Sequence, residues 1–277
     1  MAALNVKLGR LPKREDPRTL KLRTYLTPAL APPPAVTDWT TKVQSWPMFE
    51  NDTVGDCTCA AAGHDIETWT ITATGVEAQV ADQQVIAAYS AITGYDPATG
   101  ANDNGANELD VLNYWQSKET PGIAGHHIGA FAEVDPTNNQ EVEQSVYLFG
   151  GLYLGLNMPK TAQAQTSAGE PWDVGTGPDA EPGSWGGHAV PLLAYDQNSL
   201  TVVTWGALQK MTWSFLEKYC DEAYALISQD WLNSADKSPA GLNLQQLNSD
   251  LADVTGSTSS SSSSAGGSSS SSAGGSS

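Results

Sequence analysis

The stretch VGDCTCAAAGHDIETWTITA, residues 54–73, places two of the chain's three cysteines at the start of a predicted helix. Asp56 is a favourable N-cap residue and alanine has a high helix propensity, so we predict that a helix begins at Cys57. The first turn of a helix carries unpaired backbone N–H groups and the positive end of the helix dipole, which lower the pKa of a thiol. Cys57 is therefore the candidate nucleophile.

The other two cysteines, Cys59 and Cys220, are predicted to fill the hydrophobic core. Cys59 points about 200° around the helix from Cys57, and small buried cysteines are common in cores. Three cysteines, two of them one residue apart, do not suit a disulfide framework. A metal site made of Cys57, Cys59 and His64 is disfavoured because one helix cannot easily bring these side chains around one ion. We expect no metal site.

A thiol nucleophile needs a neighbouring base, and the chain has four histidines. His64 lies about 10 Å from Cys57 along the same predicted helix, too far to take its proton. His126 and His127 are adjacent and point opposite ways on a strand, so we interpret them as surface or packing residues. His188 follows glycines in GSWGGHAVPLLAYD, at the start of a predicted strand, and these glycines leave room for a substrate. His188 is the predicted partner of Cys57.

The remaining periodicity predicts the fold class. Apolar residues recur at helical spacing at 82–92 and 107–118, and a loop with a short helix is expected at 133–150. Short β-rich segments follow at 151–159, 187–196 and 200–206, separated by Gly, Pro and Asn. Helices followed by strands favour an α+β protein with two lobes.

The chain divides into three parts. Residues 1–36 form a basic arm that ends in the proline-rich stretch TPALAPPPAV, a stiff connector. Residues 37–235 are the predicted domain, within the usual single-domain range. Residues 236–277 are a predicted flexible tail, Ser/Gly-rich and disordered from about residue 252.

Composition narrows the partners. The net charge is −18, yet eight of the 13 Lys and Arg residues precede residue 51, so the domain itself is strongly acidic. An acidic body repels phosphate backbones, so we expect no nucleic-acid binding there, and we expect the arm to lie on this body. No apolar stretch has the roughly 20 residues that a membrane span needs. The N-terminal residues lack the apolar region of a secretory signal, so we expect a cytoplasmic protein unless another export route operates.

Three segments in order carry a family resemblance. ENDTVGDCTCAAA (50–62), GGHAVPLLAYD (186–196) and TVVTWG (201–206) resemble the nucleophile, histidine and following segments of the papain-like cysteine peptidases, especially their bacterial members. TDWTTKVQSWPMFEND (37–52) resembles the lead-in, so the match spans roughly residues 38–227. The resemblance implies a two-lobed fold, with a helical lobe around a central nucleophile helix and an antiparallel, barrel-like β lobe.

The resemblance also implies roles for single residues. Cys57 would attack an acyl carbon, with His188 as its base. Asn51 stands six residues before the nucleophile, where the family has a glutamine that donates to the oxyanion. Asn51 is one methylene shorter than that glutamine, and an Asx turn in END is an equally good interpretation of it.

The position that orients the histidine departs from the family. Val203 stands where the family has an asparagine, and valine cannot hydrogen-bond an imidazole. We expect Thr204 to take this role if the strand bulges; otherwise a backbone carbonyl oxygen or a water molecule takes it, or the position stays without an orienting group. Trp185 and Trp205 are expected to wall the cleft beside His188, or else to pack on the sheet.

Two classes of function follow. The first is a cysteine peptidase that hydrolyses peptide or amide bonds of a peptide or protein substrate through a Cys57 thioester, without a cofactor. The second is a catalytically impaired scaffold that binds peptides or serves a structural role. We further expect the arm to cross the surface as a strap or to block the cleft as a propeptide would, and the tail to tether the domain to a larger assembly.

Overall fold

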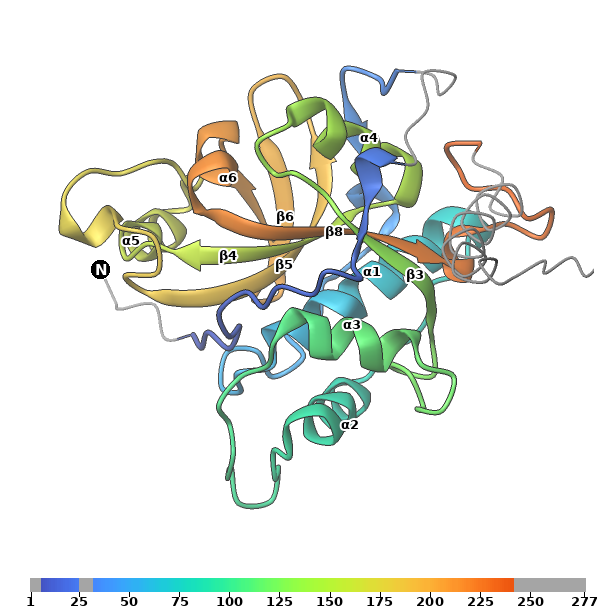
Figure 1. The fold of residues 1–277 in the computed structure, drawn as a ribbon, viewed down its shortest axis with the longest axis horizontal. Coiled ribbons are helices and arrows are strands. Elements are labelled where there is room, and N and C mark those ends of the chain that lie inside the picture. Colours follow the sequence, from blue (N-terminus) through green and yellow to red (C-terminus); the bar gives the residue numbers. More distant parts are fainter. Residues whose placement is uncertain (1–5, 25–31, 242–277) are drawn as a thin grey trace, which may run out of the picture. The chain divides into compact units, whose positions relative to one another are not determined.

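Helices dominate the described chain before residue 117, and strands dominate it after residue 127 (Figure 1). A computed structural model describes residues 6–24 and 32–241. The α-helices are α1 (Cys57–Thr74), α2 (Asp82–Thr93), α3 (Glu108–Gln116), α4 (Asn139–Phe149), α5 (Thr161–Ala168) and α6 (Trp213–Tyr219). The strands are β1 (Leu20–Lys21), β2 (Thr37–Asp38), β3 (Ile128–Glu133), β4 (Leu152–Met158), β5 (Gly186–Tyr195), β6 (Leu200–Thr204), β7 (Ala207–Met211) and β8 (Cys220–Ser228). Short 3-10 helices lie at Leu22–Thr24, Thr40–Lys42, Pro178–Ala180 and Gln229–Trp231. The predicted α+β class is confirmed.

The strands form one open sheet in the order β1-β3-β8-β4-β5-β6-β7, and β2 pairs with β5. β1 and β3 run parallel, whereas the other pairs are antiparallel. Short turns suffice to join antiparallel neighbours, and β5, β6 and β7 follow one another along the chain in this way. The strands predicted at 151–159, 187–196 and 200–206 correspond to β4, β5 and β6.

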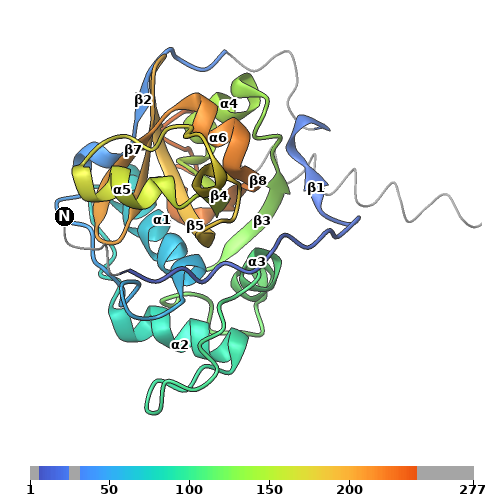
Figure 2. The same cartoon turned by 90° about the vertical axis from the view of Figure 1, so that its left-hand side faces the viewer.

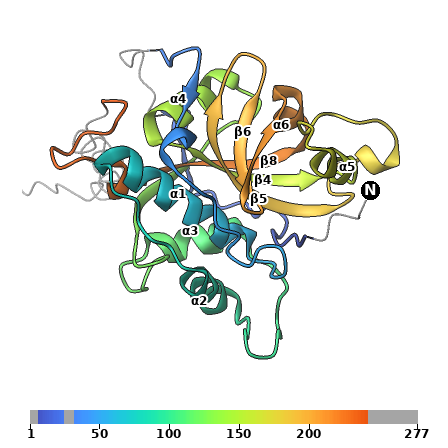
Figure 3. The same cartoon turned by 180° about the vertical axis from the view of Figure 1, so that it is seen from behind.

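Helix α1 lies between the sheet and the helices α2 and α3 (Figure 3). Every residue from Cys57 to Trp69 is buried, as expected for a helix with neighbours on all sides. The helix begins at the predicted residue with Asp56 as N-cap, although the Asp56 side chain makes no capping hydrogen bond. The N-terminus of α1, and with it Cys57, is therefore held inside the molecule.

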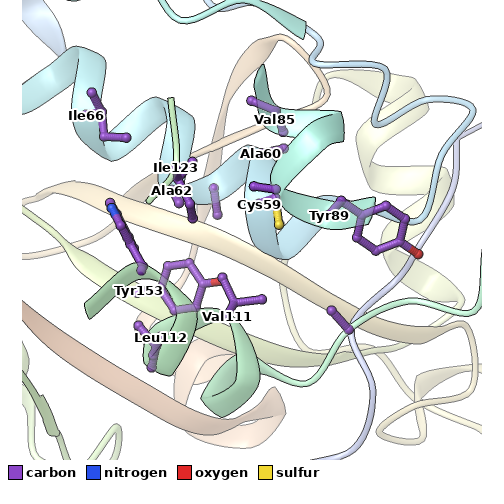
Figure 4. Close-up of a cluster of buried hydrophobic side chains, with 14 of the residues drawn as sticks. Cys59, Ala60, Ala62, Ile66, Val85, Tyr89, Val111, Leu112, Ile123 and Tyr153 are labelled. Atoms are coloured by element: carbon purple, nitrogen blue, oxygen red, sulfur yellow. The ribbon is translucent and has the colours of Figure 1, made fainter. Parts of the chain in front are cut away.

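The core of the helical part is formed where α1, α2 and α3 meet (Figure 4). Cys59 has an exposed fraction of 0% here, which confirms its predicted core position. Tyr153 of β4 reaches the same cluster and donates its hydroxyl hydrogen to the carbonyl oxygen of Thr58 at 2.7 Å. This buried hydrogen bond ties the sheet to the first turn of α1.

The N-terminal arm lies on the domain (Figures 1 and 2). Residues 6–24 belong to the same compact unit as residues 32–241. The arm crosses between β5 and the start of α3, and its backbone bonds to both sides. Arg10 N donates to Gly187 O at 3.1 Å, and Leu11 N donates to Ala106 O at 2.9 Å. The predicted tail beyond residue 241 lies outside the described residues.

No helix within residues 6–24 and 32–241 combines the length and the apolar character needed to cross a membrane.

Candidate active site

Cys57 is the first residue of α1 and has an exposed fraction of 1%. Its sulfur accepts a hydrogen bond from the backbone N–H of Ala189, with N and Sγ 3.4 Å apart. Burial raises the pKa of the Cys57 thiol to about 12, although the backbone N–H groups of Ala189 and Gly9 act in the opposite direction. The thiol is therefore neutral in this arrangement.

His188, on β5, directly precedes Ala189, whose backbone N–H bonds to the Cys57 sulfur, so α1 and β5 bring the two residues to neighbouring positions. The exposed fraction of His188 is 0%, and burial lowers the pKa of its ring to about 3. Its Nε2 lies 2.7 Å from Thr204 Oγ1. Its Nδ1 has no hydrogen-bond partner among the described residues, which leaves this nitrogen able to exchange a proton.

Thr204 rather than Val203 contacts the imidazole. The two residues are consecutive on β6, so their side chains point to opposite faces of the strand, and both are buried. The pairing of β5 with β6 is irregular between Leu192 and Ala194, and the extra residue lies on β5, whereas β6 itself keeps a regular register with β7. The hydroxyl of Thr204 is thus the side-chain partner of the His188 ring.

Two tryptophans lie beside His188. The ring of Trp205 stacks on the imidazole, with 4.6 Å between ring centroids and 15° between planes. Trp185 lies next to Trp205, with 5.5 Å between centroids. The Trp205 indole N–H donates to the Lys7 carbonyl oxygen of the arm at 3.4 Å. Trp205 therefore contacts both His188 and the arm.

The side-chain amide of Asn51 bonds within its own loop. Its side-chain nitrogen donates to Val54 O at 3.3 Å and to Asp56 Oδ1 at 3.1 Å, which uses both amide hydrogens. The short side chain instead holds together the loop that leads into α1. The oxyanion role of Asn51 therefore stays a prediction, and in this arrangement the residue supports the loop before Cys57.

The arm covers the site at Gly9. The carbonyl oxygen of Gly9 accepts a hydrogen bond from Ala106 N at 2.8 Å, on the side of the helices. A Cβ atom on Gly9 would lie 1.8 Å from Gly55 O, and one on Gly187 would lie 2.3 Å from Arg10 O. Only glycine permits such a close approach of two backbones. The space beside Gly186 and Gly187, which we interpreted as room for a substrate, is occupied by the chain's own arm.

The other histidines lie apart from Cys57. Burial lowers the pKa of His64 to about 3, and its ring packs against Phe49 with 4.8 Å between centroids. His126 Nδ1 lies 3.0 Å from Asp230 Oδ2, and His127 bonds to a backbone carbonyl oxygen. Over the same described residues, no three His, Cys, Asp or Glu side chains are grouped so that they could hold a metal ion.

The sequence and the fold were compared with those of known proteins. No protein-family model and no curated protein matches the sequence. Among solved structures, xylellain, a cysteine protease from Xylella fastidiosa, matches with a TM-score of 0.58 and 15% identity over 82% of this chain and 98% of its own. A digestive procathepsin L 3 from Tenebrio molitor larval midgut matches with a TM-score of 0.51 and 11% identity over 82% of this chain and 77% of its own.

The bromelain protease from Ananas comosus, in complex with the E64 inhibitor, matches with a TM-score of 0.50 and 17% identity over 71% of this chain and 100% of its own. All three are cysteine proteases, and the shared architecture is the papain-like one. The resemblance seen in the sequence is thus confirmed at the level of fold.

Proposed function

We propose that the chain is a cysteine peptidase in which Cys57 is the nucleophile and His188 the general base. The observation that carries this proposal is the hydrogen bond from Ala189 N–H to Cys57 Sγ, 3.4 Å long, which sets the start of α1 beside the part of β5 that carries His188. Thr204 fixes one ring nitrogen of His188 and leaves the other for proton transfer.

The proposed reaction uses the chain's own groups in two steps. The Cys57 proton passes to His188, and the thiolate attacks the carbonyl carbon of a peptide bond to form a C–S bond. The imidazolium gives its proton to the departing amine as the C–N bond breaks, which leaves a thioester. His188 then deprotonates a water molecule that hydrolyses the thioester to a carboxylic acid and restores the thiol. The Cys57 backbone N–H, at the start of α1, supplies a donor to the oxyanion.

The arm acts in this proposal as an intramolecular block. With residues 7–11 in place, both catalytic groups are buried and neutral. Departure of these residues readmits water, which removes the desolvation that raises the thiol pKa and lowers the imidazole pKa. The peptidase is therefore active only in an opened form of the chain.

One observation favours the alternative of an impaired scaffold that binds peptides. The amide hydrogens of Asn51 are committed to Val54 and Asp56, so a second oxyanion donor is missing while this loop keeps its conformation. Loss of one such donor lowers kcat by about 10²–10³. The fold would then still present a cleft for an extended peptide.

Hydrolysis of fluorescence-quenched peptides by the full-length Gly9→Val variant tests the proposal, because a side chain at this position forces the arm away from Gly55. Gly129→Val is the matched control, since a Cβ there meets only Ile227 O at 3.5 Å. We expect hydrolysis by Gly9→Val that is lost when Cys57→Ala or His188→Ala is added. Absence of hydrolysis by a folded Gly9→Val variant would favour the scaffold.

A further inference from the structure

The side chain of Arg10 is enclosed in a pocket one residue from the point where the arm covers Cys57. Its exposed fraction is 0%. Nε donates to Glu222 Oε1 at 2.9 Å, Nη2 to Glu222 Oε1 and to Asp221 Oδ1, the latter at 2.5 Å, and Nη1 to Asn157 Oδ1 at 3.5 Å. Glu108 Oε1 lies 3.5 Å from Nε. The guanidinium is thus surrounded by acceptors from β4, β8 and α3.

The pocket walls fit a planar guanidinium closely. Gly155 of β4 provides the space, because a Cβ there would lie 2.4 Å from Arg10 Nε and 2.6 Å from Glu222 Cγ. Glu222 is held from behind by the hydroxyl of Tyr224, which donates to Oε2 at 2.9 Å. A fork of N–H donors satisfies several fixed acceptors at once, which the single ammonium of lysine cannot do in the same way.

The acidic side chains of the pocket favour a bound cation. Both oxygens of Glu108 are buried without a hydrogen-bond partner; burial raises the pKa of this carboxyl well above its ordinary value, and the nearby guanidinium acts in the opposite direction by favouring the charged form. Within the part of the chain that the structure describes, Arg10 is the only cation that forms an ion pair with Glu108, Asp221 or Glu222. Buried carboxylates without a counterion are strongly unfavourable. An emptied pocket therefore favours entry of another guanidinium.

The position of the pocket relates it to the reaction. The Gly9 backbone N–H lowers the pKa of the Cys57 thiol by hydrogen bonding. The Arg10 backbone N–H donates to Gly187 O, next to His188. Extended chain placed in the same cleft would therefore carry one side chain into this pocket.

We propose that the pocket formed by Glu108, Asn157, Asp221 and Glu222 binds an arginine side chain of the substrate once residues 7–11 leave the cleft. This inference rests on the proposed peptidase function. It gives the enzyme a preference for peptides that contain arginine near the cleaved bond, with the chain's own Arg10 holding the pocket until then.

The test compares arginine with citrulline, which has nearly the same shape but no charge. Full-length Arg10→Ala, which empties the pocket, and Gly9→Val are each given five-residue alanine peptides that carry one arginine or one citrulline at each position in turn. We expect kcat/KM at one position to favour arginine at least about tenfold, in line with the strength of charge-assisted hydrogen bonds. Equal values at every position in both variants would overturn the inference.

Binding without turnover separates this inference from the proposed function. In the Cys57→Ala background of both variants, fluorescence anisotropy of labelled peptides should show the same preference for arginine. If arginine peptides bind at least about tenfold more tightly but no peptide is hydrolysed when Cys57 is present, the pocket stands and the peptidase fails. If peptides are hydrolysed without preference, the peptidase stands and the pocket fails.

Two further variants locate the preference. Glu222→Gln should bring the ratio of arginine to citrulline close to one, because it removes the carboxylate that receives both Nε and Nη2. Glu119→Gln is the matched control, an exposed residue outside the pocket, and should leave the ratio unchanged. An undiminished ratio in Glu222→Gln would overturn the assignment.

Discussion

Substitution of Gly9 by valine should expose the Cys57 thiol. In the wild type, Gly9 lies directly on the backbone of Gly55. A Cβ at Gly9 would be 1.8 Å from the carbonyl oxygen and 2.6 Å from the Cα of Gly55. These atoms belong to the main chain before α1 and cannot turn aside as a flexible side chain would. The arm must therefore separate from the cleft by more than a small adjustment.

The size of the effect follows from the thiol pKa. Burial raises the pKa of Cys57 to about 12 from the ordinary value of 9.0. At pH 8 the thiolate fraction then rises about a thousandfold when the ordinary pKa is restored, since each pKa unit is a tenfold change in the equilibrium. Access of the reagent increases at the same time, because only 1% of the residue is exposed in the closed arrangement.

Timed alkylation by iodoacetamide at pH 8, read by peptide mass spectrometry, measures this change. Gly129→Val should react like the wild type, because an added Cβ there meets only Ile227 O, at an ordinary contact distance of 3.5 Å. Cys59 is an internal reference that stays unlabelled while the core is folded. If Gly9→Val and Gly129→Val label Cys57 at the same rate, the arm does not protect the thiol and the reasoning fails.

Other predictions concern the imidazole and the pH. Thr204→Val should reduce peptide hydrolysis by the opened chain about tenfold and lower stability by about 1–3 kcal/mol, because a buried ring nitrogen loses its partner; full recovery in Thr204→Ser is expected, and an unchanged rate in Thr204→Val would argue against a positioning role. Acid should open the site, because the His188 pKa falls from 6.5 to about 3 in the closed form. Each pH unit between 6.5 and 3 then favours opening by up to about tenfold, and hydrogen-exchange protection of residues 9–11 that does not fall in this range would contradict this. The hydrogen bond to Asp230 raises the pKa of His126 above 6.5, so its stabilisation is present below pH 6.5 and lost as the pH rises through the raised value. His126→Gln should therefore lower the Tm at pH 5.5 and leave it unchanged at pH 9, whereas an equal loss at both pH values would refute the pairing.

The parts of the site that the sequence predicted have local signals. Asp56 before a run of alanines marks the start of α1, and the glycines before His188 mark the start of β5. Thr204 directly follows Val203, so a local bulge of the strand suffices to suggest Thr204 as the partner of His188. Each of these inferences needs only neighbours in the sequence, because caps, turns and strand alternation are set within a few residues.

The parts that the sequence did not predict depend on contacts between distant residues. The sequence leaves Asn51 open between an oxyanion donor and a turn within END, since the choice between the loop and a substrate is made by packing. Arg10 and Glu108 are separated by almost the whole helical half of the chain, so their pairing leaves no periodic pattern. Two glycines did indicate these contacts. Gly9 allows the arm to approach the backbone of Gly55, and Gly155 allows the guanidinium of Arg10 to approach β4.

The central claim is that Cys57 and His188 act as a nucleophile and its base beneath the arm. Alkylation of Cys57 in full-length Gly9→Val across pH 4 to 9, with and without His188→Ala, tests it most directly. The account predicts rapid labelling of Cys57 well below the pH near 8.5 at which a free thiol ionises, and loss of this low-pH reactivity in His188→Ala. A profile that is the same with and without His188, or a Cys57 as inert as the core residue Cys59, would contradict the account.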